Sequence, residues 1–165
     1  MRTAFLIFAV SGALALGIAP ASRAGQPPAT TCRPESFDLF NKELIAAQNA
    51  FQLGNAEPLK ALWSHAEDVT LMGAYGGHER GWDLVGPRLS RVSGMAGKSK
   101  HDPAKVVSKV IGSNVAVVVQ LEHIVTPDAP PSDLRVTHVA RCEGSSWRVV
   151  HRHADPLVET KMPAK

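Results

Sequence analysis

Apolar residues recur at steps of three and four over residues 35–53, and this spacing predicts a long amphipathic helix. Its apolar stripe consists of Phe37, Phe40, Leu44, Ala47 and Phe51. Pro34 suits the first turn of this helix and Gly54 suits its C-terminal cap. A short second helix, capped by Asn55, follows with Leu59, Leu62 and Trp63 on it.

The middle of the chain alternates short elements. Residues 68–74 read as a strand, and residues 75–81 form a glycine-rich stretch that we interpret as a loop. This loop has neither the lysine of a phosphate-binding loop nor dinucleotide-binding spacing. A third helix is expected from about Trp82, with Pro87 in its first turns and a loose basic loop over residues 94–100 after it.

The last third of the chain is rich in valine and changes to a strand-like pattern. Four such runs are separated by turn residues, and they cover residues 106–111, 115–126, 134–142 and 147–158. Helices first and neighbouring strands afterwards are typical of an α+β domain with a largely antiparallel sheet.

The N-terminus has the three-part layout of a secretory signal peptide. Arg2 gives a charged start, residues 5–19 are mostly apolar, and Pro20 precedes a stretch of small residues. We predict cleavage after Ala24, with cleavage after Ala21 as an alternative, and a secreted or periplasmic protein. A retained membrane anchor is the competing interpretation, although the apolar run is shorter than the usual span of about 20 residues.

Cleavage changes the charge of the mature chain. The full sequence carries 18 basic and 15 acidic residues, and loss of Arg2 and Arg23 lowers the net charge from +3 to +1. Neither nucleic acid nor, after cleavage, a membrane is therefore an expected partner. The predicted organisation is a signal peptide (1–24), a linker (25–34) and one domain (35–160).

Cys32 and Cys142 are the only cysteines, and both remain after cleavage. An exported protein favours a disulfide, but the spacing does not show that the two residues meet. A disulfide and a pair of separate thiols both stay open. No zinc-type cysteine and histidine spacing is present, and no cofactor is predicted.

Five stretches in order carry a family resemblance. They are Leu-Lys-Ala-Leu-Trp-Ser (59–64), Asp-Val-Thr-Leu-Met-Gly (68–73), residues 77–82, Leu-Arg-Val-Thr (134–137) and Trp-Arg-Val-Val-His-Arg-His-Ala-Asp (147–155). Together they resemble the SnoaL-like branch of the nuclear transport factor 2-like superfamily. The last stretch is also similar to the association domain of calcium/calmodulin-dependent protein kinases.

The resemblance implies a cone-shaped domain in which a curved, mostly antiparallel sheet wraps a long N-terminal helix and leaves a pocket. It also implies a homodimer packed through the outer sheet face. It does not imply one activity, because relatives include steroid isomerases, polyketide cyclases and proteins that only bind or assemble. The tyrosine and aspartate of the isomerases have no counterpart here, since the only tyrosine, Tyr75, lies in the expected loop.

The last two predicted strands suggest which side chains share the pocket. A turn at Gly144-Ser145 predicts that Cys142 pairs with Trp147 and His138 with His151. Alternation then predicts an inward set of Leu134, Val136, His138, Ala140, Trp147, Val149, His151, His153 and Asp155. The opposite set holds Arg135, Thr137, Arg141, Arg148, Val150 and Arg152, and we place it outside because a buried unpaired charge is costly.

The preceding strand is assigned by the same logic. If its apolar positions face inward, His123 joins the pocket and Glu122 meets the outer arginines. Pocket walls are expected from Trp63, Tyr75, Trp82 and Trp147, although each aromatic residue also fits a plain core. His78 and Glu79 either close the mouth of the pocket or are ordinary exposed loop residues.

His138, His151 and His153 leave three interpretations open. They line a partly wet cavity without chemistry, they exchange a proton with a ligand beside Asp155, or they bind a metal ion. We expect an exported domain with a histidine-lined pocket for a small, largely apolar molecule, as a lyase or isomerase. The alternative is a non-catalytic homodimeric module for ligand binding or assembly.

Overall fold

Residues 32–74 and 76–158 are described by the computed structural model. They form α1 (Ser36–Gln52), α2 (Glu57–Leu62), β1 (Thr70–Met72), β2 (His78–Arg80), α3 (Trp82–Ala96), β3 (Lys100–Ile111), β4 (Val115–Val125), β5 (Ser132–Glu143) and β6 (Ser146–Pro156). The predicted signal peptide, most of the predicted linker and Tyr75 lie outside these ranges.

The six strands form one curved sheet in the order β2-β1-β6-β5-β4-β3. Neighbouring strands are antiparallel except for β1 and β6, which run parallel. The predicted α+β class is confirmed. Two boundaries differ from expectation, because β2 forms within the predicted glycine-rich loop and β3 begins at Lys100, inside the predicted basic loop.

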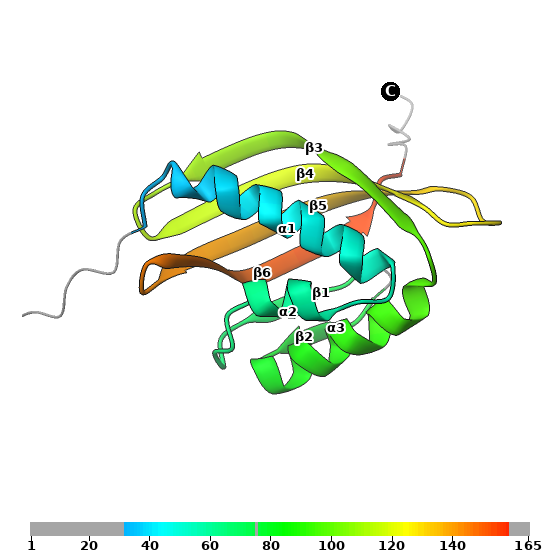
Figure 1. Ribbon diagram of the computed structural model, residues 1–165, viewed down its shortest axis with the longest axis horizontal. Helices are drawn as coiled ribbons and strands as arrows, with labels where there is room; N and C mark the ends of the chain where they lie inside the picture. The colour runs from blue at the N-terminus through cyan, green and yellow to red at the C-terminus, as the bar shows by residue number, and fades with distance from the viewer. Residues whose placement is uncertain (1–31, 75, 159–165) are drawn as a thin grey trace, which may run out of the picture.

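Helix α1 lies across the concave face of the sheet (Figure 1). All five residues of its predicted apolar stripe are buried, and Gly54 ends the helix with a φ of 94°, a backbone conformation that favours glycine. The ring of Phe37 meets Trp147 of β6 edge to face at 5.3 Å between centroids. The Nε1 atom of Trp147 donates a hydrogen bond to the Ser36 hydroxyl at 3.1 Å, so the helix start is fixed to the sheet.

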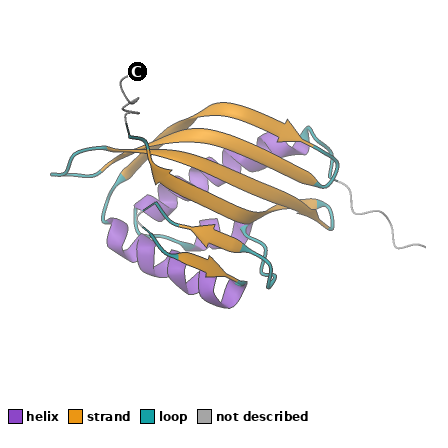
Figure 2. Ribbon diagram, turned by 180° about the vertical axis from the view of Figure 1, so that it is seen from behind, coloured by secondary structure: helices purple, strands orange, loops and turns teal. Residues whose placement is uncertain are grey.

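The remaining helices lie on the same side of the sheet as α1. Figure 2 shows the sheet from behind, with α1, α2 and α3 on its far side, so none of the described helices covers the convex face. Pro87 lies in the second turn of α3, and Gly86 lets the helix backbone approach Trp82, since an added Cβ would lie 3.1 Å from that ring. No helix in the two described ranges is long and apolar enough to cross a membrane.

Cys32 and Cys142 are joined by a disulfide, which resolves the question that the spacing left open. The bond connects residues 110 positions apart and fixes the chain just before α1 to β5. The backbone N–H of Cys32 also donates to the Ser113 carbonyl at 3.0 Å. Closing a loop of this length stabilises a fold by roughly 5 kcal/mol in the chain-entropy view.

A β-bulge changes the register between β5 and β6. The turn pairs Cys142 with Trp147 and Ala140 with Val149, as predicted. Beyond that point Val139 pairs with His151, so Val150 is an extra residue on β6. Every later β6 side chain therefore points to the face opposite to the one that a regular register predicts.

Candidate functional site in the cone interior

Six polar side chains meet on the concave face beneath α1. This interior polar cluster consists of Gln48 (α1), His101 (β3), Gln120 and Glu122 (β4), His138 (β5) and Arg152 (β6). All but Arg152 are at most 5% exposed, and the Arg152 side chain is 16% exposed. The cluster thus draws on the four long strands and the helix that crosses them.

The carboxylate of Glu122 is the centre of this cluster. Both terminal nitrogens of Arg152 donate to it, at 2.9 and 2.8 Å, in a two-pronged contact. The side-chain amides of Gln48 and Gln120 donate to Oε1 at 3.0 and 2.8 Å, and Nε2 of His101 lies 3.5 Å from Oε2. Burial alone would raise the pKa of Glu122, but the Arg152 charge, the nearby His101 ring and the hydrogen bonds from Arg152 hold it well below its usual range.

His138 is neutral and has a defined tautomer. Burial, with the neighbouring charge of Arg152, lowers its pKa to about 3. Its Nε2 atom lies 3.1 Å from a terminal nitrogen of Arg152 and 3.3 Å from the amide nitrogen of Gln48. Because a guanidinium only donates, Nε2 must be the acceptor, and the ring proton is assigned to Nδ1.

The predicted faces of β4 are wrong. Gln120 and Glu122 point inward with Val118, while the side chain of His123 is 42% exposed and bonds to Asp133 at 2.6 Å. Glu122 and the arginines were predicted on the outer face of the sheet because an unpaired buried charge is costly. Here Glu122 does meet an arginine, as expected, but the pair lies inside the cone. Each residue compensates the charge of the other, so neither charge is buried alone.

His151, His153 and Asp155 are also placed wrongly, because of the bulge at Val150. His151 faces the convex side, where its Nδ1 lies 2.7 Å from the Thr70 hydroxyl; burial and the nearby His153 lower its pKa. His153 is exposed, 3.8 Å from Asp155, which pairs with Arg135. Only His138 of the three histidines lies in the interior, so neither the shared proton-transfer site nor a three-histidine metal site is formed.

The predicted aromatic walls divide into core and surface. Trp63 and Trp147 are 2% and 4% exposed and pack in the main core. Trp82 stacks on His65 at 3.9 Å and lines a surface hollow of about 410 Å³ that also contains Glu67 and Arg80. Tyr75 lies outside the described residues. His78 is exposed on β2, and Glu79 lies beside Arg88 of α3.

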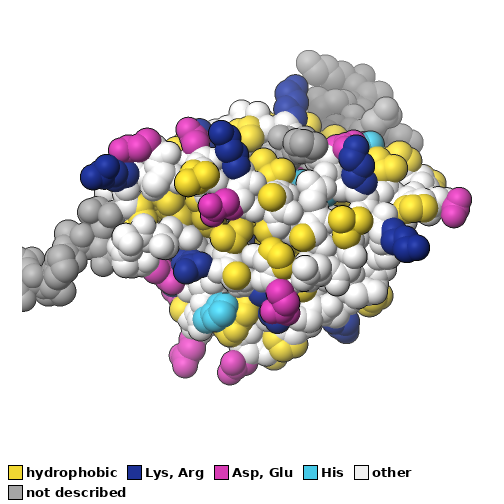
Figure 3. All heavy atoms as spheres, viewed as in Figure 1, with side chains coloured by type: hydrophobic (Ala, Val, Ile, Leu, Met, Phe, Trp, Pro, Cys, Tyr) yellow, Lys and Arg dark blue, Asp and Glu magenta, His cyan; other side chains and the backbone are white. Residues whose placement is uncertain are grey.

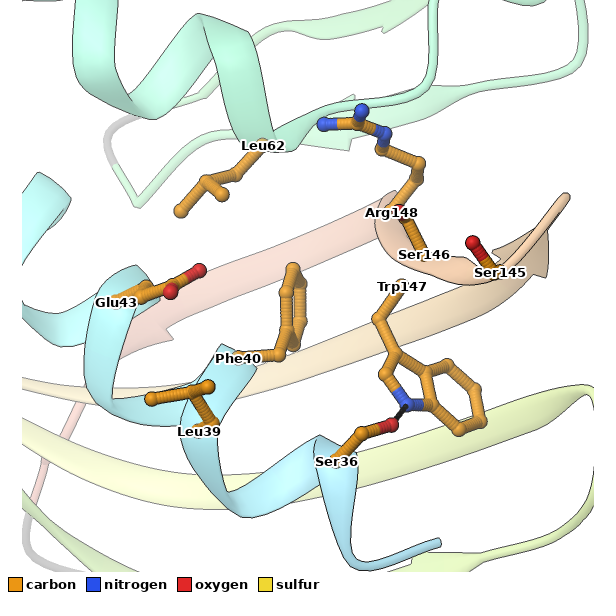
Figure 4. Close-up of a pocket in the computed structure, with 9 residues that line it drawn as sticks. All are labelled: Ser36, Leu39, Phe40, Glu43, Leu62, Ser145, Ser146, Trp147 and Arg148. Carbon is orange, nitrogen blue, oxygen red and sulfur yellow. Dashed lines mark hydrogen bonds between the residues drawn. The ribbon is translucent and has the colours of Figure 1, made fainter. Parts of the chain in front are cut away.

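A second hollow, of about 200 Å³, opens between α1, the end of α2 and the β5–β6 turn (Figure 4). Leu39, Phe40 and Leu62 give it apolar walls, with Glu43 and Arg148 beside them. On the molecular face seen in Figure 3, acidic and basic side chains are interspersed among apolar ones. Neither hollow includes a member of the interior polar cluster.

Five members of the cluster were missed as site residues: Gln48, His101, Gln120, Glu122 and Arg152. Gln48 carried a usable signal, since it lies four residues after Leu44 on the buried side of the helix. Gln120 alternates with Val118 within a valine-rich strand, which was a weaker signal. His101 fell between the predicted basic loop (94–100) and the predicted strand (106–111), and Arg152 could not be placed without knowing of the bulge.

The comparisons with known proteins identify the fold. No family model matches the chain, and no curated protein matches it. Among solved structures, the chain is similar to a domain from Thiobacillus denitrificans provisionally assigned as a calcium/calmodulin-dependent protein kinase type II association domain. That similarity has a TM-score of 0.65 and 23% identity, over 78% of this chain and 98% of the other.

Two further solved structures are similar to this chain over most of its length. A Streptomyces avermitilis protein of the NTF2-like family, provisionally assigned as a dehydratase, matches with a TM-score of 0.61 and 19% identity, over 76% and 96% of the two chains. An uncharacterised Caulobacter vibrioides protein with a cystatin-like fold matches with the same score and identity, over 75% and 89%. The chain therefore has the NTF2-like, cystatin-like fold, as the resemblance implied.

The Glu122–Arg152 pair is expected to be strongly interdependent. Glu122→Leu alone leaves a buried guanidinium unpaired and should lower the free energy of unfolding by about 3–5 kcal/mol. Arg152→Met should cost a similar amount, whereas the double variant should recover most of the loss. Urea denaturation followed by circular dichroism measures all three. The matched control is Arg135→Met, which breaks an exposed pair and should cost less than about 1 kcal/mol.

The low pKa of His138 predicts acid sensitivity that begins above the range of carboxylates. As pH falls below 6.5, the unfolded state takes up a proton that the folded state, with a pKa of about 3, does not. Stability is therefore complete above about pH 6.5 and should fall by about 2 kcal/mol by pH 5. Glu122, whose pKa is lowered, adds a further loss below about 4.5.

Urea midpoints measured from pH 7.5 to 5 test this pH dependence. His138→Gln, which has no titrating group, should flatten the curve in that window. His78→Gln removes an exposed histidine and should leave the wild-type slope. Parallel curves for wild type and His138→Gln would show that His138 does not carry the effect.

Proposed function

We propose that the mature chain is an exported, homodimeric, non-catalytic binding module that holds a small molecule in the cone interior. The observation that carries this proposal is the interior polar cluster itself. The Glu122 carboxylate is held ionised by Arg152, and His138 is held neutral by burial and by the charge of Arg152. Such groups fix the position of a ligand well, but they are poorly suited to exchange protons at neutral pH.

A lyase or isomerase is the second candidate, and His101 is the observation that favours it. This histidine is 1% exposed, and neither ring nitrogen has a hydrogen-bond partner of good geometry among the described residues. The dehydratase assignment of the Streptomyces avermitilis neighbour is compatible with this version. Turnover of a ketone, enol or epoxide that His101→Ala abolishes would favour the enzyme over the binding module.

The convex sheet face supports the homodimer. Half-buried apolar side chains from β4 and β5 form its centre: Val117, Val119, Leu121 and Val139. Arg135 and Arg141 flank them on β5, and none of the helices within residues 32–74 and 76–158 covers this face (Figure 2). An apolar centre with a polar rim is the usual anatomy of a modest protein interface. The neighbour from Thiobacillus denitrificans is described as an association domain, which agrees with assembly.

The homodimer predicts a mass of twice the monomer in light scattering at micromolar concentration. Val119→Asp places a charge in the centre of the convex face and should yield monomers without loss of helix signal. Leu39→Asp is the matched control, because Leu39 is 63% exposed on α1, away from that face. A wild-type monomer throughout the range would refute the assembly part of the proposal.

Export and ligand binding predict two features of the protein isolated from its native host. Under denaturing conditions its mass should be that of a 141-residue chain beginning at Gly25, or of one beginning at Ser22, less two hydrogens for the Cys32–Cys142 bond. Under native conditions a small-molecule adduct should be present. A chain that keeps Met1 and two free thiols would contradict export, and a native spectrum without any adduct would contradict binding.

A further inference from the structure

Several atoms of the interior polar cluster have no hydrogen-bond partner among the described residues. They are Oε1 of Gln48, Oε1 of Gln120, Nδ1 of His138 and both ring nitrogens, Nδ1 and Nε2, of His101. All four side chains are at most 5% exposed. A buried polar atom without a partner costs about 1–3 kcal/mol, so five such atoms in one connected cluster indicate a place for a bound molecule.

The Glu122 carboxylate fixes which atom of each glutamine is free. Gln48 and Gln120 both turn a nitrogen toward Oε1 of Glu122, and a carboxylate that is ionised only accepts hydrogen bonds. A flipped amide would place two oxygens against each other. The unpartnered atoms of both glutamines are therefore carbonyl oxygens, and both are hydrogen-bond acceptors.

The two histidines complete the set. His138 accepts through Nε2, so its free Nδ1 carries a proton and is a donor. His101 turns Nε2 toward Oε2 of Glu122 at 3.5 Å without a hydrogen bond of good geometry, and neither ring nitrogen has a partner. A proton on Nε2 suits this approach to a carboxylate and leaves Nδ1 as a free acceptor. The charges of Glu122 and Arg152 compensate each other through two hydrogen bonds. The charges of this pair therefore cancel next to the free atoms.

From this set we infer that the ligand is a small, uncharged molecule that donates at least two hydrogen bonds and accepts one, such as a primary amide or a compound with several hydroxyl groups. This inference rests on the proposed binding function and names its ligand class. A carboxylate ligand is disfavoured, because two of the free atoms are carbonyl oxygens that only accept, and Glu122 already occupies the guanidinium. A largely apolar ligand, which the sequence led us to expect, would leave the free atoms unpartnered.

Three molecules of nearly equal size separate the ligand classes. Acetamide donates and accepts, acetone only accepts, and acetate is an anion that only accepts. Each is titrated into the ¹⁵N-labelled full-length mature protein, and the ring nitrogens of His138 and the side-chain amides of Gln48 and Gln120 are observed by NMR. Acetamide should shift these signals in a saturable manner, with an affinity at least about ten-fold higher than that of acetone or acetate.

Variants test whether the named atoms make the contacts. Gln48→Leu and Gln120→Leu keep similar volume but remove an acceptor, and each should weaken acetamide binding about five-fold, the equivalent of one hydrogen bond. Gln52→Leu, at the end of the same helix and outside the cluster, is the matched control and should bind as wild type does. Chemical shifts of the remaining residues confirm that each variant is folded.

The outcomes separate this inference from the proposed function. Preferential binding of acetamide that depends on Gln48 and Gln120 supports the ligand class. Equal or tighter binding of acetone or acetate overturns the class, while the binding function stands. Saturation by none of the three, together with a native mass spectrum that shows no adduct, overturns both and leaves the cluster as a hydrated structural element.

Discussion

The buried ion pair between Glu122 and Arg152 determines the character of the cone interior. Two charges can lie beneath α1 only because each is neutralised by the other, and because Gln48 and Gln120 satisfy the remaining capacity of the carboxylate. Breaking such a pair is costly, whereas replacing it with apolar residues is often neutral or stabilising. The pair is therefore weak evidence for a stability role and stronger evidence for a role in specifying how polar side chains are arranged.

The arrangement depends in turn on one backbone irregularity. Without the extra residue at Val150, β6 would turn His151 and His153 inward and Arg152 outward. Glu122 would then be buried without its guanidinium, a state whose cost exceeds that of most single substitutions. The bulge and the inward Glu122 thus require each other, although β4 and β6 are separated in the sheet by β5. A side chain on one strand specifies the register of another through charge compensation.

Most of the fold could be predicted from the sequence, because it depends on patterns that repeat. The stripe from Phe37 to Phe51 and the valine-rich strands each contain several apolar positions, so the periodic pattern is recognisable even where one position departs from it. The faces of β5 followed from the turn at Gly144, and the pairing of Cys142 with Trp147 was correct. The site could not be predicted in the same way. The site depends on which alternate set of β4 side chains faces inward and on a single bulge in β6. A shift of one residue exchanges the two faces of a strand.

The same comparison explains why charge alone was a misleading guide. The prediction treated each arginine as an isolated charge and so placed Arg152 outside with Arg135 and Arg148. Burial depends on the partner as much as on the residue, and the partner, Glu122, was assigned to the same outer face as Arg152. Both residues were assigned to the wrong face, and for this reason the predicted contact between Glu122 and an arginine was correct although its side of the sheet was wrong. Opposite charges that share one face of a sheet can be buried together as a pair, so both faces of the sheet were possible for Glu122 and Arg152. The polar Gln48 on the buried face of α1 favours the inner face.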